Sequence, residues 1–151
     1  MQVDGVSVSL SPKEVAGLVK SLPLPKGIHV SDVSLTDNGM EATVKTSLLL
    51  GLPMKFRIEI DHFQGSKVFI KVSPPVKPNW LVVRPMVMAI PGASYVGNSM
   101  IEVDLVSSSR GYLSGITLKK ISLNKSGFLG EAVSITSTAS WAEILHLLTL
   151  G

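Results

Sequence analysis

The chain of 151 residues contains no cysteine, which excludes disulfide bonds and thiolate metal sites. Aromatic residues make up only 5% of it, and the basic residues are scattered, with no run longer than Lys119-Lys120. Proteins that bind nucleic acid combine a clustered basic stripe with aromatic side chains that stack on bases. Because both features are absent, we expect no nucleic-acid partner.

The sequence also lacks any apolar stretch of the roughly 18 residues that suggest a membrane-spanning helix. Its first residues, Met1-Gln-Val-Asp-Gly5, have neither the basic segment nor the apolar segment of a secretory signal. We therefore expect a soluble chain, cytoplasmic or peripheral to a membrane if this N-terminus is intact.

Motifs for catalysis or nucleotide binding are missing as well. There is no Gly-x-Ser-x-Gly elbow, Walker loop or Gly-x-Gly-x-x-Gly sequence, and these are the signatures of hydrolases and nucleotide-binding proteins. The histidines His29, His62 and His146 lie in three different segments. Asp61 precedes His62, but neighbours on a strand point to opposite faces. We expect a non-enzymatic protein with no metal and no cofactor.

Apolar residues, by contrast, are abundant. They make up 45% of the chain, whereas charged residues make up 17%, below the roughly 25% that is typical of soluble domains. The length fits a single domain, residues 1–151. A ligand groove, a subunit interface or a membrane-contact surface would use the apolar excess. An unusually apolar core is the alternative.

One segment occurs twice. Residues 28–35, Ile-His-Val-Ser-Asp-Val-Ser-Leu, precede a turn at Asp37-Asn-Gly39, and residues 116–123, Ile-Thr-Leu-Lys-Lys-Ile-Ser-Leu, precede a turn at Lys125-Ser-Gly127. The apolar spacing and the glycine-closed turn agree in both. The chain therefore reads as two degenerate β-meander repeats, at approximately residues 5–73 and 99–136.

Within both copies the alternation of apolar residues changes parity, at Ser31-Asp32 and at Lys119-Lys120. Such a change predicts a β-bulge or a strong local twist. The second copy is also shorter. Its segment 107–115 replaces a capped helix of the first copy, so we expect a loop there.

That helix is expected at residues 12–22. Ser11 is a good N-cap, Pro12 suits the first helical position and Glu14 completes a capping box. One apolar stripe follows at helical spacing, formed by Val15, Leu18, Val19 and Leu22. We expect this face to lie on a sheet.

Two further segments are strongly apolar. Residues 79–90 form either a buried helix kinked at Pro85 or a strand that this proline breaks, and a cap at Asn79 favours the helix. Residues 140–150 predict a C-terminal helix with Ser140 as its cap.

The order of elements indicates an α+β fold. The bulges favour a highly curved antiparallel β-sheet wrapped around helices.

The pattern resembles the tubular lipid-binding superfamily, to which bactericidal permeability-increasing protein and a number of small bacterial domains belong. Three segments carry the likeness: residues 5–14, residues 28–40 and Ile101-Glu-Val-Asp-Leu105. The resemblance covers roughly residues 2–136. It implies a curved sheet around a long helix, an apolar groove that holds acyl chains, and no catalysis.

We therefore predict non-enzymatic binding or carriage of a lipid or another elongated apolar molecule. Alternating residues of strand 54–60 and residues of the 79–90 helix are the candidate groove lining: Met54, Phe56, Ile58, Ile60, Met86, Met88 and Ile90. Core packing alone is the alternative role for each. A second hypothesis is an interaction module that forms a homodimer or a peripheral membrane contact. Its interface candidates are Trp141, Ile144, Leu145 and Leu148.

Overall fold

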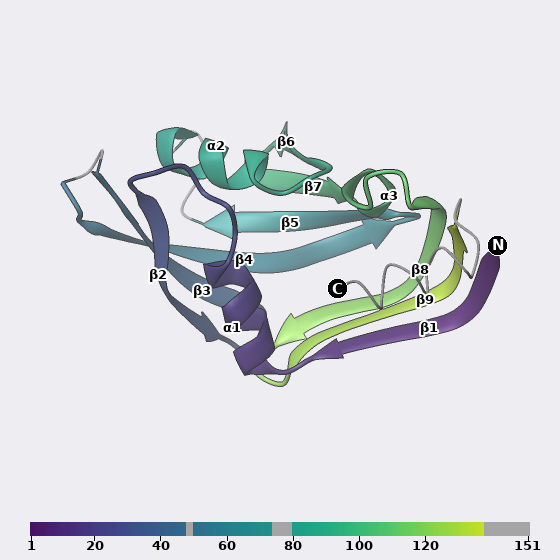
Figure 1. Cartoon of the computed structure of the whole chain (residues 1–151). Coiled ribbons are helices and arrows are strands. Elements are labelled where there is room, and N and C mark those ends of the chain that lie inside the picture. Colours follow the sequence, from purple (N-terminus) through teal and green to yellow (C-terminus); the bar gives the residue numbers. More distant parts are fainter. Residues whose placement is uncertain (48–49, 74–79, 138–151) are drawn as a thin grey trace.

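The computed structural model describes residues 1–47, 50–73 and 80–137, apart from the side chains of residues 80–82 (Figure 1). The expected helix at 140–150 and its interface candidates Trp141, Ile144, Leu145 and Leu148 lie outside these residues. In chain order the elements are β1 (Gln2–Leu10), α1 (Pro12–Lys20), β2 (Ile28–Leu35), β3 (Met40–Thr46), β4 (Pro53–Gln64), β5 (Lys67–Ser73), α2 (Trp80–Met88), β6 (Ala93–Gly97), β7 (Met100–Asp104), α3 (Leu105–Ser108), β8 (Leu113–Asn124) and β9 (Gly127–Ser137).

The strands form two antiparallel sheets. The small sheet has the order β1-β9-β8, and the large sheet has the order β2-β3-β4-β5-β7-β6. Both are flat, and the few helices are short, so the fold is mostly β. The expected α+β class and the highly curved sheet wrapped around helices are therefore wrong. A nine-residue helix such as α1 is only about 13 Å long, too short to be the axis of such a wrap.

The expected bulges are present, but their effect stays local. The register between β2 and β3 shifts between Val30 and Asp32, and the register between β8 and β9 shifts between Leu118 and Lys120. A bulge adds one residue to one strand and bends it there. The bulges therefore do not curl either sheet as a whole.

The pairing of strands explains why there are two sheets. β1, the first strand of the first expected repeat, pairs with β9. β7, the first strand of the second, pairs with β5. Each of these strands thus lies beside the last strand of the other repeat (Figure 1). This exchange of first strands separates the chain into two sheets that both repeats build together.

The helices differ between the repeats. In α1 the Glu14 amide donates to Ser11 Oγ (3.2 Å) and the Ser11 amide donates to Glu14 Oε1 (3.0 Å), so the predicted capping box is confirmed. The hydrogen bond from the Ser11 backbone, with a smaller effect of its side chain, lowers the pKa of Glu14. At the matching place the second repeat has α3, one turn capped by Asp104, where a loop was expected.

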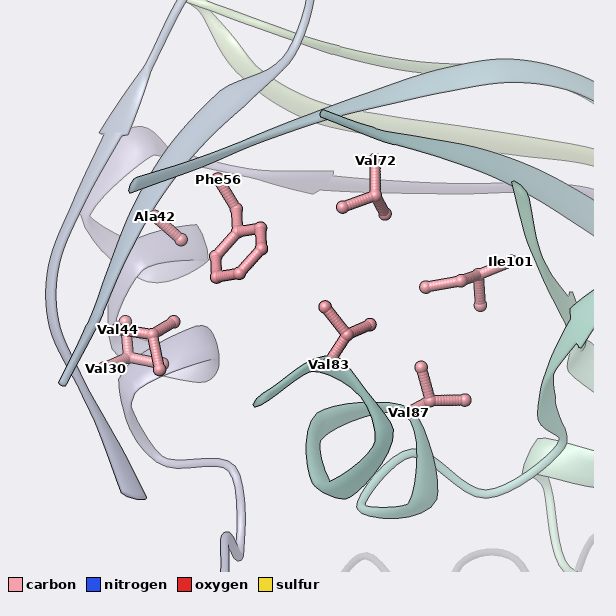
Figure 2. Packing of buried hydrophobic residues seen from close by; sticks show 8 residues of the cluster. All are labelled: Val30, Ala42, Val44, Phe56, Val72, Val83, Val87 and Ile101. Carbon is pink, nitrogen blue, oxygen red and sulfur yellow. The ribbon is translucent and has the colours of Figure 1, made fainter. Parts of the chain in front are cut away.

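The buried core lies between the large sheet and α2. The presence of α2 confirms the prediction of a helix within residues 79–90. Figure 2 shows Val83 and Val87 of α2 pointing toward Phe56 and Ile101 of the sheet. The cluster comprises Val30, Ala42, Val44, Phe56, Val72, Val83, Val87 and Ile101. We call the sheet face that carries α1 and α2 its inner face.

Candidate functional site

An apolar cavity of about 320 Å³ lies between the inner face of the large sheet and the two longer helices. Its lining comes from four strands of that sheet, from α1 and α2 and from the segments that directly follow these helices, and every lining side chain is apolar. They are Leu18, Val19, Leu22, Met40, Ala42, Val44, Phe56, Ile58, Ile70, Val72, Val83, Met86, Val87, Ile90, Ile101 and Val103. We call this the first cavity.

A second cavity, of about 310 Å³, lies between the large sheet and the small one. The small sheet contributes Leu10, Ile121, Leu123 and Phe128, and α3 contributes Leu105. The two cavities share Leu18, Val19, Met40, Ile58, Ile70 and Val103. The two cavities therefore adjoin each other along the inner face of the large sheet, and we call them together the trough. Each volume lies at the lower end of the range of about 300–1,000 Å³ for small-molecule pockets.

The trough opens to solvent beside α1. Leu18 lines both cavities, yet it is 57% exposed. A leucine of a one-face helix is normally covered, since burying it contributes about 1.5–3 kcal/mol. Leu18 therefore lines both cavities and is also in contact with solvent, and we call its surroundings the entrance.

The chemistry of the lining excludes most ligand classes. No lining side chain carries a charge or a hydroxyl. Among the described residues no buried side-chain nitrogen or oxygen lacks a hydrogen-bond partner. A polar molecule would lose its water and find no replacement hydrogen bonds, which is unfavourable. The trough suits an apolar chain, and the flexible Met40 and Met86 can adapt to its shape.

Most of the predicted groove residues meet here. Phe56, Ile58, Met86 and Ile90 line the first cavity, and Ile58 and Ile60 line the second. Met54 packs against the core cluster instead. Met88 is 71% exposed and lies in a shallow surface depression with Arg84 and three prolines. Whether any of these residues binds a ligand stays a prediction.

The sequence-based candidates omitted the strands next to β4. Ile58 pairs with Val72, Ile60 with Ile70, and Ile70 with Ile101, so these residues share one face. All but Ile60 line the first cavity. The alternation of 68–72 and 101–105 was visible in the sequence, but it does not say which strands are neighbours. The apolar face of the 12–22 helix was expected to lie on a sheet, and its spacing alone does not show that a cavity adjoins it.

The sequence argument about Asp61 and His62 was wrong. His62 Nδ1 lies 2.6 Å from Asp61 Oδ2, because the register between β4 and β5 shifts between Ile60 and His62. A bulge there turns neighbouring side chains to the same side. His62 also stacks on Phe69, with ring centroids 4.4 Å apart. Both side chains are exposed, so a hydrogen bond at the surface accounts for their contact.

Two kinds of feature are absent from the described part of the chain. No group of three or more histidine or acidic side chains there could hold a metal ion. No helix there is both long enough and apolar enough to cross a bilayer.

Comparisons with known proteins give no match. The chain matches no protein-family model, no curated protein and no solved structure. The likeness to the tubular lipid-binding superfamily therefore stays a prediction, and the curled sheet that it implied is not observed. The site is interpreted from its own geometry and chemistry.

Proposed function

We propose that the protein binds or carries a lipid-like molecule without catalysing a reaction, and that the apolar chain of this ligand occupies the trough. The observation that carries the proposal is the pair of adjoining cavities, lined only by apolar side chains, along one face of the large sheet. A packed core would have filled this space, since protein interiors contain few voids larger than a water molecule.

The energetics support a chain-like ligand. Burying about ten methylene groups contributes on the order of 8 kcal/mol. Losses of translational, rotational and conformational freedom reduce this figure. Such a trough therefore gives useful affinity without any polar contact inside it.

The polar head of such a ligand has to remain outside. The lining offers it no hydrogen-bond partner, so the head lies at the entrance beside Leu18. Lys20 stands in the last turn of the same helix. Lysines near a lipid surface favour anionic head groups, and we expect the ligand to carry one.

The test is equilibrium binding of a fluorescent long-chain fatty acid. Ile70 belongs to both cavities, and Ile70→Trp places a larger ring in the trough. The matched control is Val133→Trp, since Val133 is 52% exposed and lines neither cavity. We expect the first variant to lose binding and the control to bind like the wild type. Unchanged binding by Ile70→Trp, or no binding by the wild type, would contradict the proposal.

The second hypothesis, an interaction module, is not favoured by a specific observation, because its interface candidates lie outside the described residues. Replacement of Leu145 and Leu148 by lysine, followed by sedimentation, remains its test.

A further inference from the structure

Two leucines in the described part of the turn between β3 and β4 are exposed. Leu50 is 93% exposed and Leu52 is 64% exposed, and these values place them among the most exposed large apolar residues described. The turn lies at the far end of the hairpin from α3 (Figure 1). An apolar hairpin tip of this kind contributes little to the core.

The backbone at this tip is strained. Leu50 has a φ of 56°, a left-handed conformation that costs a residue with a side chain about 1–2 kcal/mol relative to the usual helical one. Glycine would adopt it at less cost. The chain thus presents a large apolar side chain to solvent at a position where its own fold favours glycine. Strain of this sort is typical of functional positions.

The surroundings of the tip are basic. The Ser47 amide donates to the Gly27 carbonyl (2.9 Å), which places the 21–27 loop beside the base of the turn. Segments 21–31 and 44–56 contain Lys26, Lys45 and Lys55 and no acidic residue. Lys55 lies 4.0 Å from Glu41, which partly offsets its charge, while the other two lysines have no acidic partner within their own segments.

We propose that the Leu50/Leu52 tip docks the protein on a bilayer that contains anionic lipid. The two leucines enter the boundary between head groups and acyl chains, and the lysines contact the lipid head groups. Amphipathic surfaces bind membranes through this combination of buried apolar area and electrostatic attraction. Burial of the two leucines in the bilayer removes the cost of exposing them to water. The free energy gained also offsets the cost of the left-handed conformation of Leu50.

Docking goes beyond ligand binding, but the two are connected in space. Val44 lines the first cavity, and it precedes by two residues the end of β3 at Thr46. Contact through the tip therefore places one end of the trough close to the membrane surface. A lipid could then move between bilayer and trough over a short path.

The absence of cysteine makes a clean test possible. Leu52→Cys, labelled with an environment-sensitive nitrobenzoxadiazole dye, reports on the tip alone, and labelled Val133→Cys reports on the small sheet. With vesicles of phosphatidylcholine and phosphatidylglycerol in equal parts, we expect a blue shift and increased emission only at position 52. High salt should weaken the change, because it screens the lysines.

A second variant separates docking from folding. Leu50→Gly relieves the left-handed leucine, so its thermal midpoint should be equal to or above that of the wild type. Its binding to the same vesicles should be weaker by about tenfold, since it loses one leucine of buried apolar area. A structural role alone would lower the midpoint and leave vesicle binding unchanged.

Three results would overturn the proposal. They are no dye response at position 52 with vesicles, equal vesicle binding by Leu50→Gly, and a blue shift without lipid that accompanies dimerisation, which would make the tip a contact between two chains. Fatty-acid binding in solution does not involve the tip. Failure of docking with retained fatty-acid binding is therefore distinguishable from failure of the proposed function.

Discussion

The two sheets differ in how their inner sides are filled. The large sheet and the helices α1 and α2 that cover it carry almost all of the buried apolar residues described, whereas the small sheet contributes Ala132 alone. The side chains that the small sheet turns toward its neighbour line the second cavity instead. The half with the large sheet thus holds the buried core cluster, most of whose residues also line the first cavity, whereas the small sheet lines the second cavity with half-buried side chains.

This difference arises although the two repeats share a sequence pattern. Val30 in β2 is 8% exposed, while Leu118, which holds the matching place in β8, is only half-buried. Ile121 and Leu123 line the second cavity. β2 and β8 share one sequence pattern but are packed differently, because the first repeat has the nine-residue α1 and the second has the four-residue α3. The missing helix leaves apolar surface that a ligand can cover.

The largest expected effect compares one phenylalanine from each half. Phe56 is 3% exposed and belongs to the core cluster, whereas Phe128 is half-buried and lines the second cavity. Phe56→Ala should lower the free energy of unfolding by about 3–5 kcal/mol. Phe128→Ala should lower it by about half as much, because its side chain is only half-buried and less apolar surface is lost on truncation. Urea unfolding measures both, and equal losses would show that the halves are packed alike.

The next effect concerns the close approach of Gly127 to β1 in the small sheet. Gly127 has a φ of 116°, and a Cβ added there would overlap the Leu10 carbonyl oxygen. Gly65 has a φ of 62° with open space around it. We expect Gly127→Ala to cost about 3 kcal/mol and Gly65→Ala about 1 kcal/mol. Thermal unfolding of both variants checks this, and a smaller loss at Gly127 would mean that β1 moves aside freely.

A smaller effect concerns α1, which the second repeat lacks. Its capping box lowers the pKa of Glu14 below the ordinary 4.5. A lowered folded pKa means that Glu14 contributes stability above pH 4.5 and that this contribution disappears as the pH falls through the folded pKa. The stability difference between wild type and Glu14→Gln should therefore shrink over that window in acid-dependent urea titrations. Ser11→Ala should remove only the smaller, side-chain part of this pH dependence, because the Ser11 amide that donates to Glu14 is kept. A difference that is independent of pH would contradict the capping box.

The smallest effect tests a contact between the halves. Lys125 Nζ lies 3.1 Å from Asp37 Oδ1, so the two repeated turns meet in an exposed ion pair. Exposed pairs of this kind contribute about 0.2–1 kcal/mol, and often nothing measurable. A double-mutant cycle with Lys125→Ala and Asp37→Ala should give a coupling near the lower limit. A coupling well above about 1 kcal/mol would show that the turns lock the sheets together.

Local structure was largely predictable from the sequence. Ser11, Pro12 and Glu14 identified the start of α1, and the parity changes identified both bulges, because each of these signals acts between residues close in the chain. The apolar segment around Pro85 was confirmed as helix. Its prediction depended only on neighbouring residues.

The arrangement of the strands was not predictable. β1 pairs with β9 across nearly the whole chain, and no local pattern specifies such a partner. The expected curl assumed that each repeat folds on itself, so the exchange of β1 and β7 was missed. The short β6, Ala93–Gly97, was missed too, because it carries little apolar alternation.

For the candidate site too, the sequence predicted features within one strand but not contacts between distant segments. Alternation along β4 correctly placed Phe56, Ile58 and Ile60 on one face, and these line the cavities. Met88 was misplaced, since helical spacing alone does not tell which side of α2 meets the sheet. The walls that the two cavities share depend on the long-range pairing of β5 with β7.

Native mass spectrometry of the purified protein tests the central claim most directly. We predict a species heavier than the bare chain by the mass of one lipid-like molecule, reduced or absent in Ile70→Trp and retained in Val133→Trp. A bare-chain mass that long-chain fatty acid does not change would contradict the account, because the trough would then hold no apolar chain.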